Sequence, residues 1–171
     1  MVEATEEEGV GYQNSFLRTD GKGLPFLHLK AGGSVSPASH FTVDHRLHYI
    51  YQEGRNVYRY AVTDMSDDVM EVMKLGNLKA EDVNWVVPHE ANLRIIEAVA
   101  KRADIPLEKV MINIEHYGNT SSASIPLALW DNEAKLKKGD NVVLTAFGAG
   151  FTHGASFYKW GYDGAAMEDN K

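Results

Sequence analysis

The chain has 171 residues, 44% of them hydrophobic, so it can bury one sizeable core and we expect a single α/β domain. Its net charge of −7 argues against a nucleic-acid partner, because phosphate binding requires clustered Lys and Arg. It contains no cysteine, which excludes disulfides, thiolate metal sites and a cysteine nucleophile from this chain.

The chain shows no targeting or membrane signal. Its first residues are acidic where a secretory signal would be basic and then apolar. No apolar run approaches the roughly 18 residues that a membrane-spanning helix needs. We therefore expect a cytoplasmic protein without a membrane partner.

The first half of the sequence predicts one strand, one insertion and one long helix. Residues 10–21 alternate weakly and end on Asp-Gly, which favours a strand followed by a turn. Residues 22–53 are rich in Gly, Pro, Ser and His without a period, which indicates a loop-rich insertion. From Arg55 to about Leu75 the apolar residues fall three and four apart, as on one helical face, and Gly76-Asn77 ends the helix.

The second half alternates strands and helices. Strands are expected at 83–88, 110–114, 141–147 and 152–160, and a tail at 162–171 is expected to be disordered. One helix is expected from about Asn92 to Ala103, and another from polar caps at Asn119–Ser122 to about Leu136. The first of these should bury four residues: Leu93, Ile96, Val99 and Ala100. This order predicts a mixed, mainly parallel five-stranded sheet with helices on both faces and an antiparallel last strand.

Polar and glycine residues follow three of the expected strands. His89 lies in "PHEAN", Asn119 lies in "HYGNTSS", and the glycine turn 148–150 lies in "FGAGF". In open α/β sheets such residues meet beyond the carboxyl ends of the strands. A neutral imidazole and an amide are uncharged donors that can hold a carbonyl oxygen as it becomes an enolate, and backbone amides of the turn can form a second oxyanion hole. The pattern favours carbanion chemistry at a thioester or ketone, with the nucleophile missing.

Three segments carry a resemblance to a known family: "WVVPHEANLRII", "HYGNTSSASIPLAL" and "LTAFGAGFTHGASFYKW". From about Val10 to Trp160 the chain resembles the C-terminal half of β-ketoacyl-acyl-carrier-protein synthase III, a condensing enzyme of the thiolase superfamily. The resemblance implies two similar packed halves, a catalytic cysteine in the N-terminal half, and a homodimer. Residues 1–171 would then be one C-terminal thiolase-like half-domain, and we expect Met1 to fall inside a strand of a longer protein.

The resemblance also implies roles for individual residues. His89 and Asn119 would bind the malonyl thioester carbonyl and stabilise the enolate that forms as CO₂ leaves. Phe147 would pack beneath the histidine, and the N–H of Ala149 would serve the oxyanion hole. Residues lining the CoA or pantetheine tunnel would be Gly54, Tyr58, Ala61 and Asn92. Residues docking the acidic acyl carrier protein would be Arg94, extended by Lys101 and Arg102.

Two residues depart from the family's usual pattern. Glu90 stands where the family commonly has Gln, and a charge there would raise the pKa of His89 and spoil its role as a neutral donor. Ala149 replaces a usual Gly, which a backbone donor tolerates only if φ stays negative.

Simpler interpretations compete with these roles. His89 alone could be a buried histidine at a strand end, Tyr58 could be core, and the basic residues of the second helix could be a solvated face, since acidic residues alternate with them. Residue types that ligate zinc occur in the insertion at His40, Asp44, His45 and His48, but we expect a polar loop over the site and no metal. The sequon at Asn119 is discounted because no secretory signal accompanies it, and "GAGFTHG" lacks the spacing of a dinucleotide loop.

The function predicted is that of the C-terminal half of 3-oxoacyl-acyl-carrier-protein synthase III, which initiates fatty-acid synthesis by decarboxylative Claisen condensation of malonyl-acyl-carrier-protein with acyl-CoA. We expect these substrates, no cofactor, and no condensation by the isolated chain, which lacks the nucleophile. The apolar face that would cover the missing half should cause self-association. The alternatives are a non-catalytic module that binds CoA or carrier protein, and another thiolase-like acyl-CoA condensing enzyme.

Overall fold

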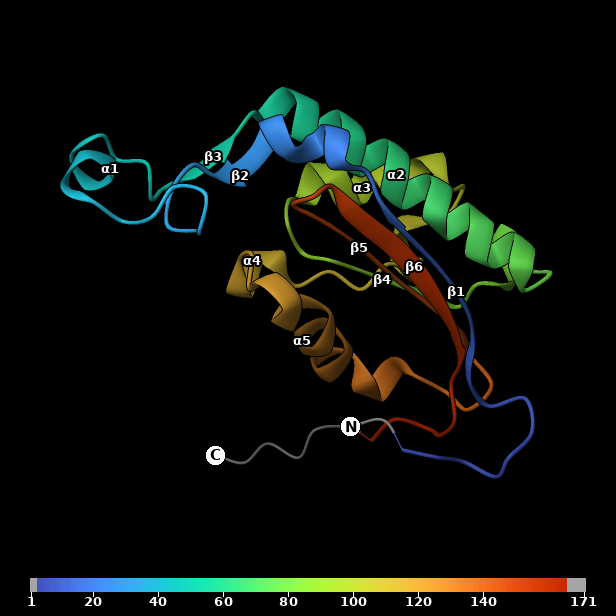
Figure 1. Ribbon diagram of the computed structural model, residues 1–171. Coiled ribbons are helices and arrows are strands. Elements are labelled where there is room, and N and C mark those ends of the chain that lie inside the picture. Colours follow the sequence, from blue (N-terminus) through green and yellow to red (C-terminus); the bar gives the residue numbers. More distant parts are fainter. Residues whose placement is uncertain (1–2, 166–171) are drawn as a thin grey trace.

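A computed structural model describes residues 3–165, which are built around a four-stranded sheet (Figure 1). The strands lie in the order β1 (Gly11–Thr19), β6 (Thr152–Lys159), β5 (Asn141–Gly148) and β4 (Trp85–Pro88). β4 and β5 are parallel, whereas β6 is antiparallel to both β5 and β1. The expected mixed α/β sheet with one antiparallel strand is therefore present.

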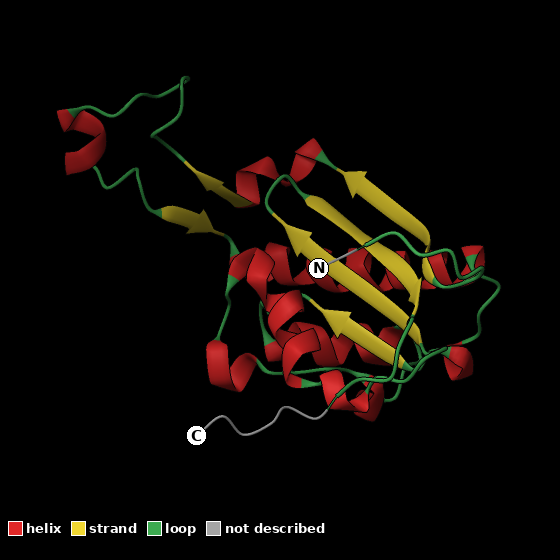
Figure 2. Ribbon diagram, turned by 90° about the horizontal axis from the view of Figure 1, so that it is seen from below, coloured by secondary structure: helices red, strands yellow, loops and turns green. Residues whose placement is uncertain are grey.

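Helices cover both faces of the sheet (Figures 1 and 2). On one face lie α2 (Gly54–Leu75) and α3 (Leu93–Arg102); α2 packs against β5 and β6, and α3 packs against α2. α4 (Ile114–Tyr117) and α5 (Ser124–Asp131) lie on the other face, and α5 packs against β4. The apolar stripe predicted for the long helix is its buried side: Val57, Ala61, Met65, Val69, Val72 and Met73.

The fifth strand, predicted at 110–114, is absent among the described residues. Only Val110 makes an isolated parallel bridge, to Val86, supported by the hydrogen bond from Met111 N to Val86 O of 2.9 Å. The chain then turns at Asn113 into α4, so the ladder stops after one bridge.

Two helix predictions also need correction. Leu93 is 42% exposed, because it is the first residue after the N-cap and lies at the open end of α3, and Ile95 is buried in its place. α5 ends at Asp131 rather than near Leu136. The side-chain amide of Asn132 donates to the Ala128 carbonyl at 2.9 Å and ends the helix, and a 3₁₀ turn (Glu133–Lys135) follows.

The insertion at 22–53 has more regular structure than a loop. It contains a 3₁₀ helix (Gly21–Phe26), β2 (Leu27–Leu29), α1 (His40–Asp44) and β3 (Ile50–Gln52). β2 and β3 pair antiparallel, and the segment projects from the body as an arm with α1 near its tip (Figures 1 and 2). Several large apolar side chains of the arm are exposed: Leu29, Val35, Phe41, Val43, Tyr49, Ile50 and Tyr51.

The first residues after β6 are hydrogen-bonded to the region that follows α5. The Tyr162 hydroxyl donates to Glu133 at 3.1 Å, and Gly164 N donates to Leu136 O at 2.8 Å. Residues 162–165, expected to belong to a disordered tail, therefore pack on the turn after α5. The rest of that tail, 166–171, lies outside the described residues.

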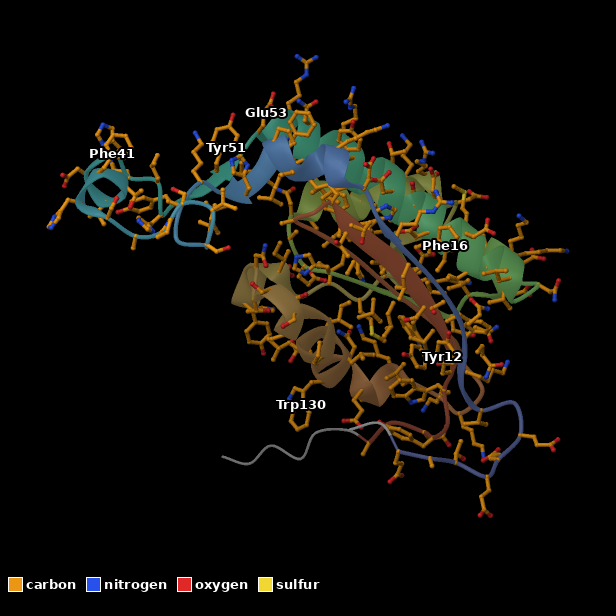
Figure 3. The ribbon with its side chains drawn as sticks, in the orientation of Figure 1. Tyr12, Phe16, Phe41, Tyr51, Glu53 and Trp130 are labelled. Carbon is orange, nitrogen blue, oxygen red and sulfur yellow. The ribbon has the colours of Figure 1, made fainter. Side chains whose placement is uncertain are left out.

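Part of the sheet face that carries α5 has no helix over it (Figures 1 and 3). Tyr12 and Leu17 on β1 are 58% and 76% exposed, and Trp130 on α5 is 59% exposed. These residues supply the exposed apolar surface expected of a half-domain, and self-association stays a prediction. Across residues 3–165, no helix combines the length and apolar character needed to cross a membrane.

Candidate active site

A large open cavity of about 1660 Å³ lies at the carboxyl ends of β4 and β5. It is lined by every predicted site residue except Lys101 and Arg102: His89, Asn119, Phe147, Ala149, Gly54, Tyr58, Ala61, Asn92 and Arg94. His89, Asn119 and the glycine turn, which were expected to meet, therefore lie around one cavity.

His89 is placed by β4 and held by α5. Its backbone N–H donates to the Thr145 carbonyl at 2.8 Å, extending the β4–β5 ladder by one residue. Its Nδ1 lies 2.7 Å from the Oγ of Ser124, which is 1% exposed. When the Ser124 hydroxyl donates to Nδ1, the ring proton lies on Nε2, and an N–H donor remains for a ligand.

Burial lowers the pKa of His89, and burial is its only resolved cause. The concern that Glu90 would raise this pKa is therefore wrong. The imidazole is neutral at neutral pH, which is the state that a donor to a thioester oxygen requires.

Asn119 lies in the loop between α4 and α5. Gly118, with φ of 65°, turns the chain out of α4, and the Asn119 Oδ1 accepts a hydrogen bond from Ser121 N at 2.9 Å. Because the oxygen is engaged, the NH₂ group of Asn119 is the part left free to donate to a ligand.

The turn after β5 lies at the cavity. Phe147 and the turn residues Gly148 and Ala149 line the cavity, and Phe147 packs on Phe151 with ring centroids 4.7 Å apart. Ala149 keeps a negative φ, whereas Gly150 has a φ of 141°. The condition for replacing glycine by Ala149 is therefore met, because the left-handed position falls on the next residue.

The predicted pantetheine residues come from two helix starts. Gly54, Tyr58 and Ala61 belong to the first two turns of α2. Asn92 is the N-cap of α3, and its Oδ1 accepts from Arg94 N at 2.9 Å, so its NH₂ group remains available to a ligand. The Arg94 guanidinium lies 5.6 Å from the centroid of the Tyr58 ring, and Tyr58 also packs against the core beneath α2.

Lys101 and Arg102 lie farther along α3 and do not line the cavity. Arg102 pairs with Asp67 at 2.6 Å on the surface, which offsets its charge. Lys101 is two turns from Arg94, about 10 Å along the helix. The docking role of Lys101 and Arg102 stays a prediction, and of the three predicted docking residues only Arg94 lines the cavity.

Two buried groups around His89 were not predicted correctly from the sequence. Ser124 received no role there, although a hydroxyl in the helix facing a strand end is a natural partner for an imidazole. Glu90 was expected to act on His89, but it is 1% exposed and both its oxygens lack a well-formed hydrogen bond among the described residues. The backbone amides of Asn113 and Ile114 lower its pKa, but burial dominates and raises it to about 7.

Two histidines of the arm are hydrogen-bonded within it. His45 Nδ1 lies 2.8 Å from the Phe41 carbonyl oxygen, and His48 Nε2 lies 2.9 Å from Thr42 Oγ1. Within residues 3–165, no group of three or more potential metal ligands is present.

The hydrogen bond to Ser124 should fix the orientation and the tautomer of the His89 ring. In the Ser124→Ala variant, the ring should lose its orientation, and both neutral tautomers should become populated. ¹⁵N NMR of the His89 ring across pH 5 to 8 measures both the tautomers and the pKa, which burial should hold below that of an ordinary histidine in the unsubstituted chain. Ser122→Ala serves as the control, because Ser122 is exposed. A single unchanged tautomer in Ser124→Ala would contradict this assignment.

The comparisons with known proteins agree with this geometry. The family model described as 3-Oxoacyl-[acyl-carrier-protein (ACP)] synthase III C terminal matches residues 73–160. Beta-ketoacyl-[acyl-carrier-protein] synthase III of Phocaeicola vulgatus is 64% identical over 165 residues, which are 96% of this chain and 49% of that protein. The Porphyromonas gingivalis protein of the same name is 58% identical over 167 residues, which are 98% of this chain and 50% of that protein.

Solved structures show the same relationship. The crystal structure of 3-oxoacyl-(acyl carrier protein) synthase III from Pseudomonas aeruginosa PAO1 superposes with a TM-score of 0.79 at 38% identity, over 94% of this chain and 48% of that one. The corresponding synthase from Aquifex aeolicus VF5 gives a TM-score of 0.78 at 36% identity, over 92% of this chain and 46% of that one. This chain spans about half the length of the curated relatives it matches. It belongs to the 3-oxoacyl-[acyl-carrier-protein] synthase III family and corresponds to the C-terminal, thiolase-like half.

Proposed function

We propose that this chain supplies the decarboxylation and substrate-binding half of a 3-oxoacyl-acyl-carrier-protein synthase III. The complete enzyme would condense malonyl-acyl-carrier-protein with an acyl group from acyl-CoA and so initiate fatty-acid synthesis. The observation that carries the proposal is the convergence of His89, Asn119 and the Ala149 turn on one cavity. The acyl carrier protein, CoA thioesters, the N-terminal half and a second copy of the enzyme are the proposed partners, and no cofactor takes part.

His89 and Asn119 would act on the malonyl group. The thioester carbonyl oxygen accepts from His89 Nε2–H and from the Asn119 NH₂ group. The bond between the α-carbon and the carboxylate breaks, CO₂ leaves, and the electron pair becomes an enolate whose oxygen the two donors stabilise. A cationic His89 would also attract the malonyl carboxylate and stabilise the ground state, so the lowered pKa of His89 favours the reaction.

The second step would need the other half. The α-carbon of the enolate attacks the acyl thioester carbon on the cysteine of the N-terminal half. The new oxyanion accepts a hydrogen bond from Ala149 N–H, and it collapses as the thiolate leaves. Gly54, Tyr58, Ala61 and Asn92 would hold the pantetheine arm along the cavity, with Arg94 at its mouth facing the carrier protein.

The two steps can be separated experimentally, because decarboxylation needs the enolate donors and not the nucleophile. We expect the purified chain to convert malonyl-CoA slowly to acetyl-CoA and CO₂, with uptake of one proton. It should form no acetoacetyl-CoA when acetyl-CoA is added. CO₂ release and chromatography of the thioesters measure the two products. Condensation by the chain alone, or no decarboxylation at saturating malonyl-CoA, would contradict the proposal.

The absence of cysteine favours one second candidate, a module that binds CoA or carrier protein without turnover. The same preparation distinguishes it. Calorimetric binding of CoA without any decarboxylation supports the binding module, and absence of binding to both CoA and carrier protein excludes it.

A further inference from the structure

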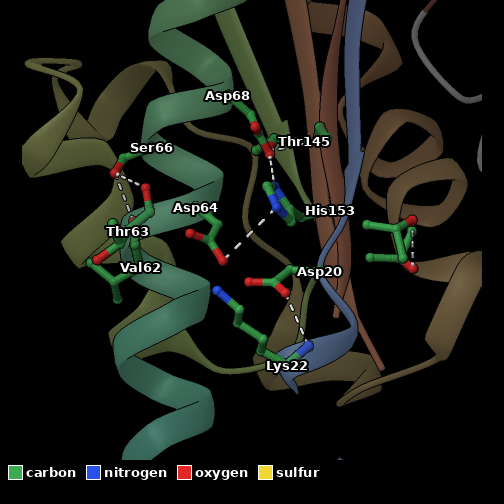
Figure 4. Close-up of polar contacts among 12 residues, drawn as sticks. Asp20, Lys22, Val62, Thr63, Asp64, Ser66, Asp68, Thr145 and His153 are labelled. Atoms are coloured by element: carbon green, nitrogen blue, oxygen red, sulfur yellow. Dashed lines mark hydrogen bonds and ion pairs between the residues drawn. The ribbon is translucent and has the colours of Figure 1, made fainter. Parts of the chain in front are cut away.

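His153 on β6 faces two aspartates of α2, Asp64 and Asp68 (Figure 4), and it also lines the cavity. The Nδ1–H of His153 donates to the Oδ2 of Asp68 at 2.6 Å, and the Nε2 lies 4.0 Å from the Oδ2 of Asp64. The His153 side chain is 8% exposed and that of Asp68 is 1% exposed. The two aspartates are one helical turn apart on α2, so both ring nitrogens of His153 face the same helix.

His153 also lies next to Phe147 and the 148–150 turn, which take part in the proposed reaction. It lines the cavity and stands opposite Phe147 in the β5–β6 register, with the two rings 6.3 Å apart and inclined by 27°. Phe147 packs in turn on Phe151. The turn with the Ala149 amide lies between these two phenylalanines, and His153 follows it on β6. The pairing of His153 with Asp68 therefore ties the base of the turn to α2.

The charges around His153 make this pairing costly to lose. Burial raises the pKa of Asp68 and of Asp64, and His153 opposes the rise at both. Arg18, which stands opposite His153 on β1, also lowers both pKa values, whereas Asp20 and Asp67 raise that of Asp64. A buried carboxylate that loses its partner is strongly unfavourable. Asp68 therefore holds His153 in one place, and His153 lowers the pKa of Asp68 against the effect of burial.

We propose that His153, held by Asp68 and Asp64, is a positioning residue for the reaction: it supports Phe147 and the 148–150 turn so that the Ala149 amide points into the cavity. This inference rests on the proposed function and adds residues that act through the position of the turn. Displacing a preorganised donor by about 1 Å can cost up to a hundredfold in rate while substrate binding elsewhere is kept.

The experiment compares variants of the complete enzyme, this chain joined to the N-terminal half that supplies the cysteine, in the condensation step, because the Ala149 amide acts on the oxyanion of that step. Asp68→Asn leaves both aromatic rings in place and removes the charge that holds His153. We expect kcat to fall about tenfold with KM within twofold. His153→Ala should lower kcat further, and His153→Gln, which keeps an N–H donor for Asp68, should recover part of that loss. Asp67→Asn, an exposed aspartate on the same helix, is the matched control and should leave kcat unchanged.

A second readout does not depend on activity. The ¹H–¹⁵N NMR signal of the Ala149 amide should move in Asp68→Asn and stay in place in Asp67→Asn. An unmoved Ala149 signal in Asp68→Asn overturns the inference, and so does a moved signal with unchanged kcat in the active complete enzyme. If the unsubstituted chain does not decarboxylate malonyl-CoA, the proposed function fails, and the Ala149 signal alone decides whether the network holds the turn.

Discussion

Replacing His89 by Ala should lower the rate of malonyl-CoA decarboxylation by about 10²–10³-fold, which corresponds to the loss of one preorganised oxyanion donor. Asn119→Ala should cause a similar loss, because each residue contributes one uncharged donor to the same oxygen. The binding of CoA itself should change little, since CoA carries no malonyl carbonyl. Initial rates of CO₂ release and calorimetry with CoA provide the two measurements.

Two comparisons make this result specific. His28→Ala removes another imidazole that lines the same cavity on the arm side, and it should leave the rate within about twofold. The loss of decarboxylation rate in the double variant His89→Ala/Asn119→Ala should be much smaller than the two single losses combined, because the two donors share one charge. A full decarboxylation rate in His89→Ala would remove His89 from the mechanism.

Replacing Glu90 by Gln should stabilise the chain at alkaline pH and change little near pH 4. The pKa of Glu90 is raised from 4.5 to about 7 by burial. A carboxyl whose folded pKa lies above its unfolded value contributes stability below the unfolded pKa and loses it as pH rises through the folded pKa. The unfolding free energy should therefore fall between about pH 4.5 and 7 and level off above that. The Gln variant, which is neutral throughout, should lack this fall.

The size of the effect of Glu90 on the unfolding free energy follows from the rise in its pKa. The rise in the pKa of Glu90 from 4.5 to about 7 corresponds to at most about 3 kcal/mol of unfolding free energy, and relaxation of the site should reduce this to about 1–2 kcal/mol at pH 8. Urea unfolding at pH 4.5, 6, 7 and 8 measures the profile, with Glu108→Gln as an exposed control. Parallel profiles for the Glu90→Gln and unsubstituted chains would show that Glu90 is not the group that titrates.

The sequence predicted the elements wherever a local pattern was long enough. The four-and-three spacing from Val57 to Val72 identified α2, and Gly76 marked its end. Local patterns failed where a long-range contact or a single side chain decided the outcome. The 110–114 segment has the composition of a strand, yet it pairs with β4 only at Val110 before α4 begins. Asn132 ends α5 through one side-chain hydrogen bond that the apolar pattern does not show.

For the site, the sequence by itself determined which residue types stand at the strand ends: His89, Asn119 and the glycine turn. Their convergence could be inferred because parallel strands end at one edge of a sheet. The tertiary structure decided their chemical states. It alone brought Ser124 to the His89 ring and buried Glu90, whose carboxyl has no well-formed hydrogen bond among residues 3–165. It also joined His153 on β6 to Asp68 on α2, 85 residues away in the sequence. Protonation and orientation depend on burial and on partners distant along the chain, and those are properties of the folded packing.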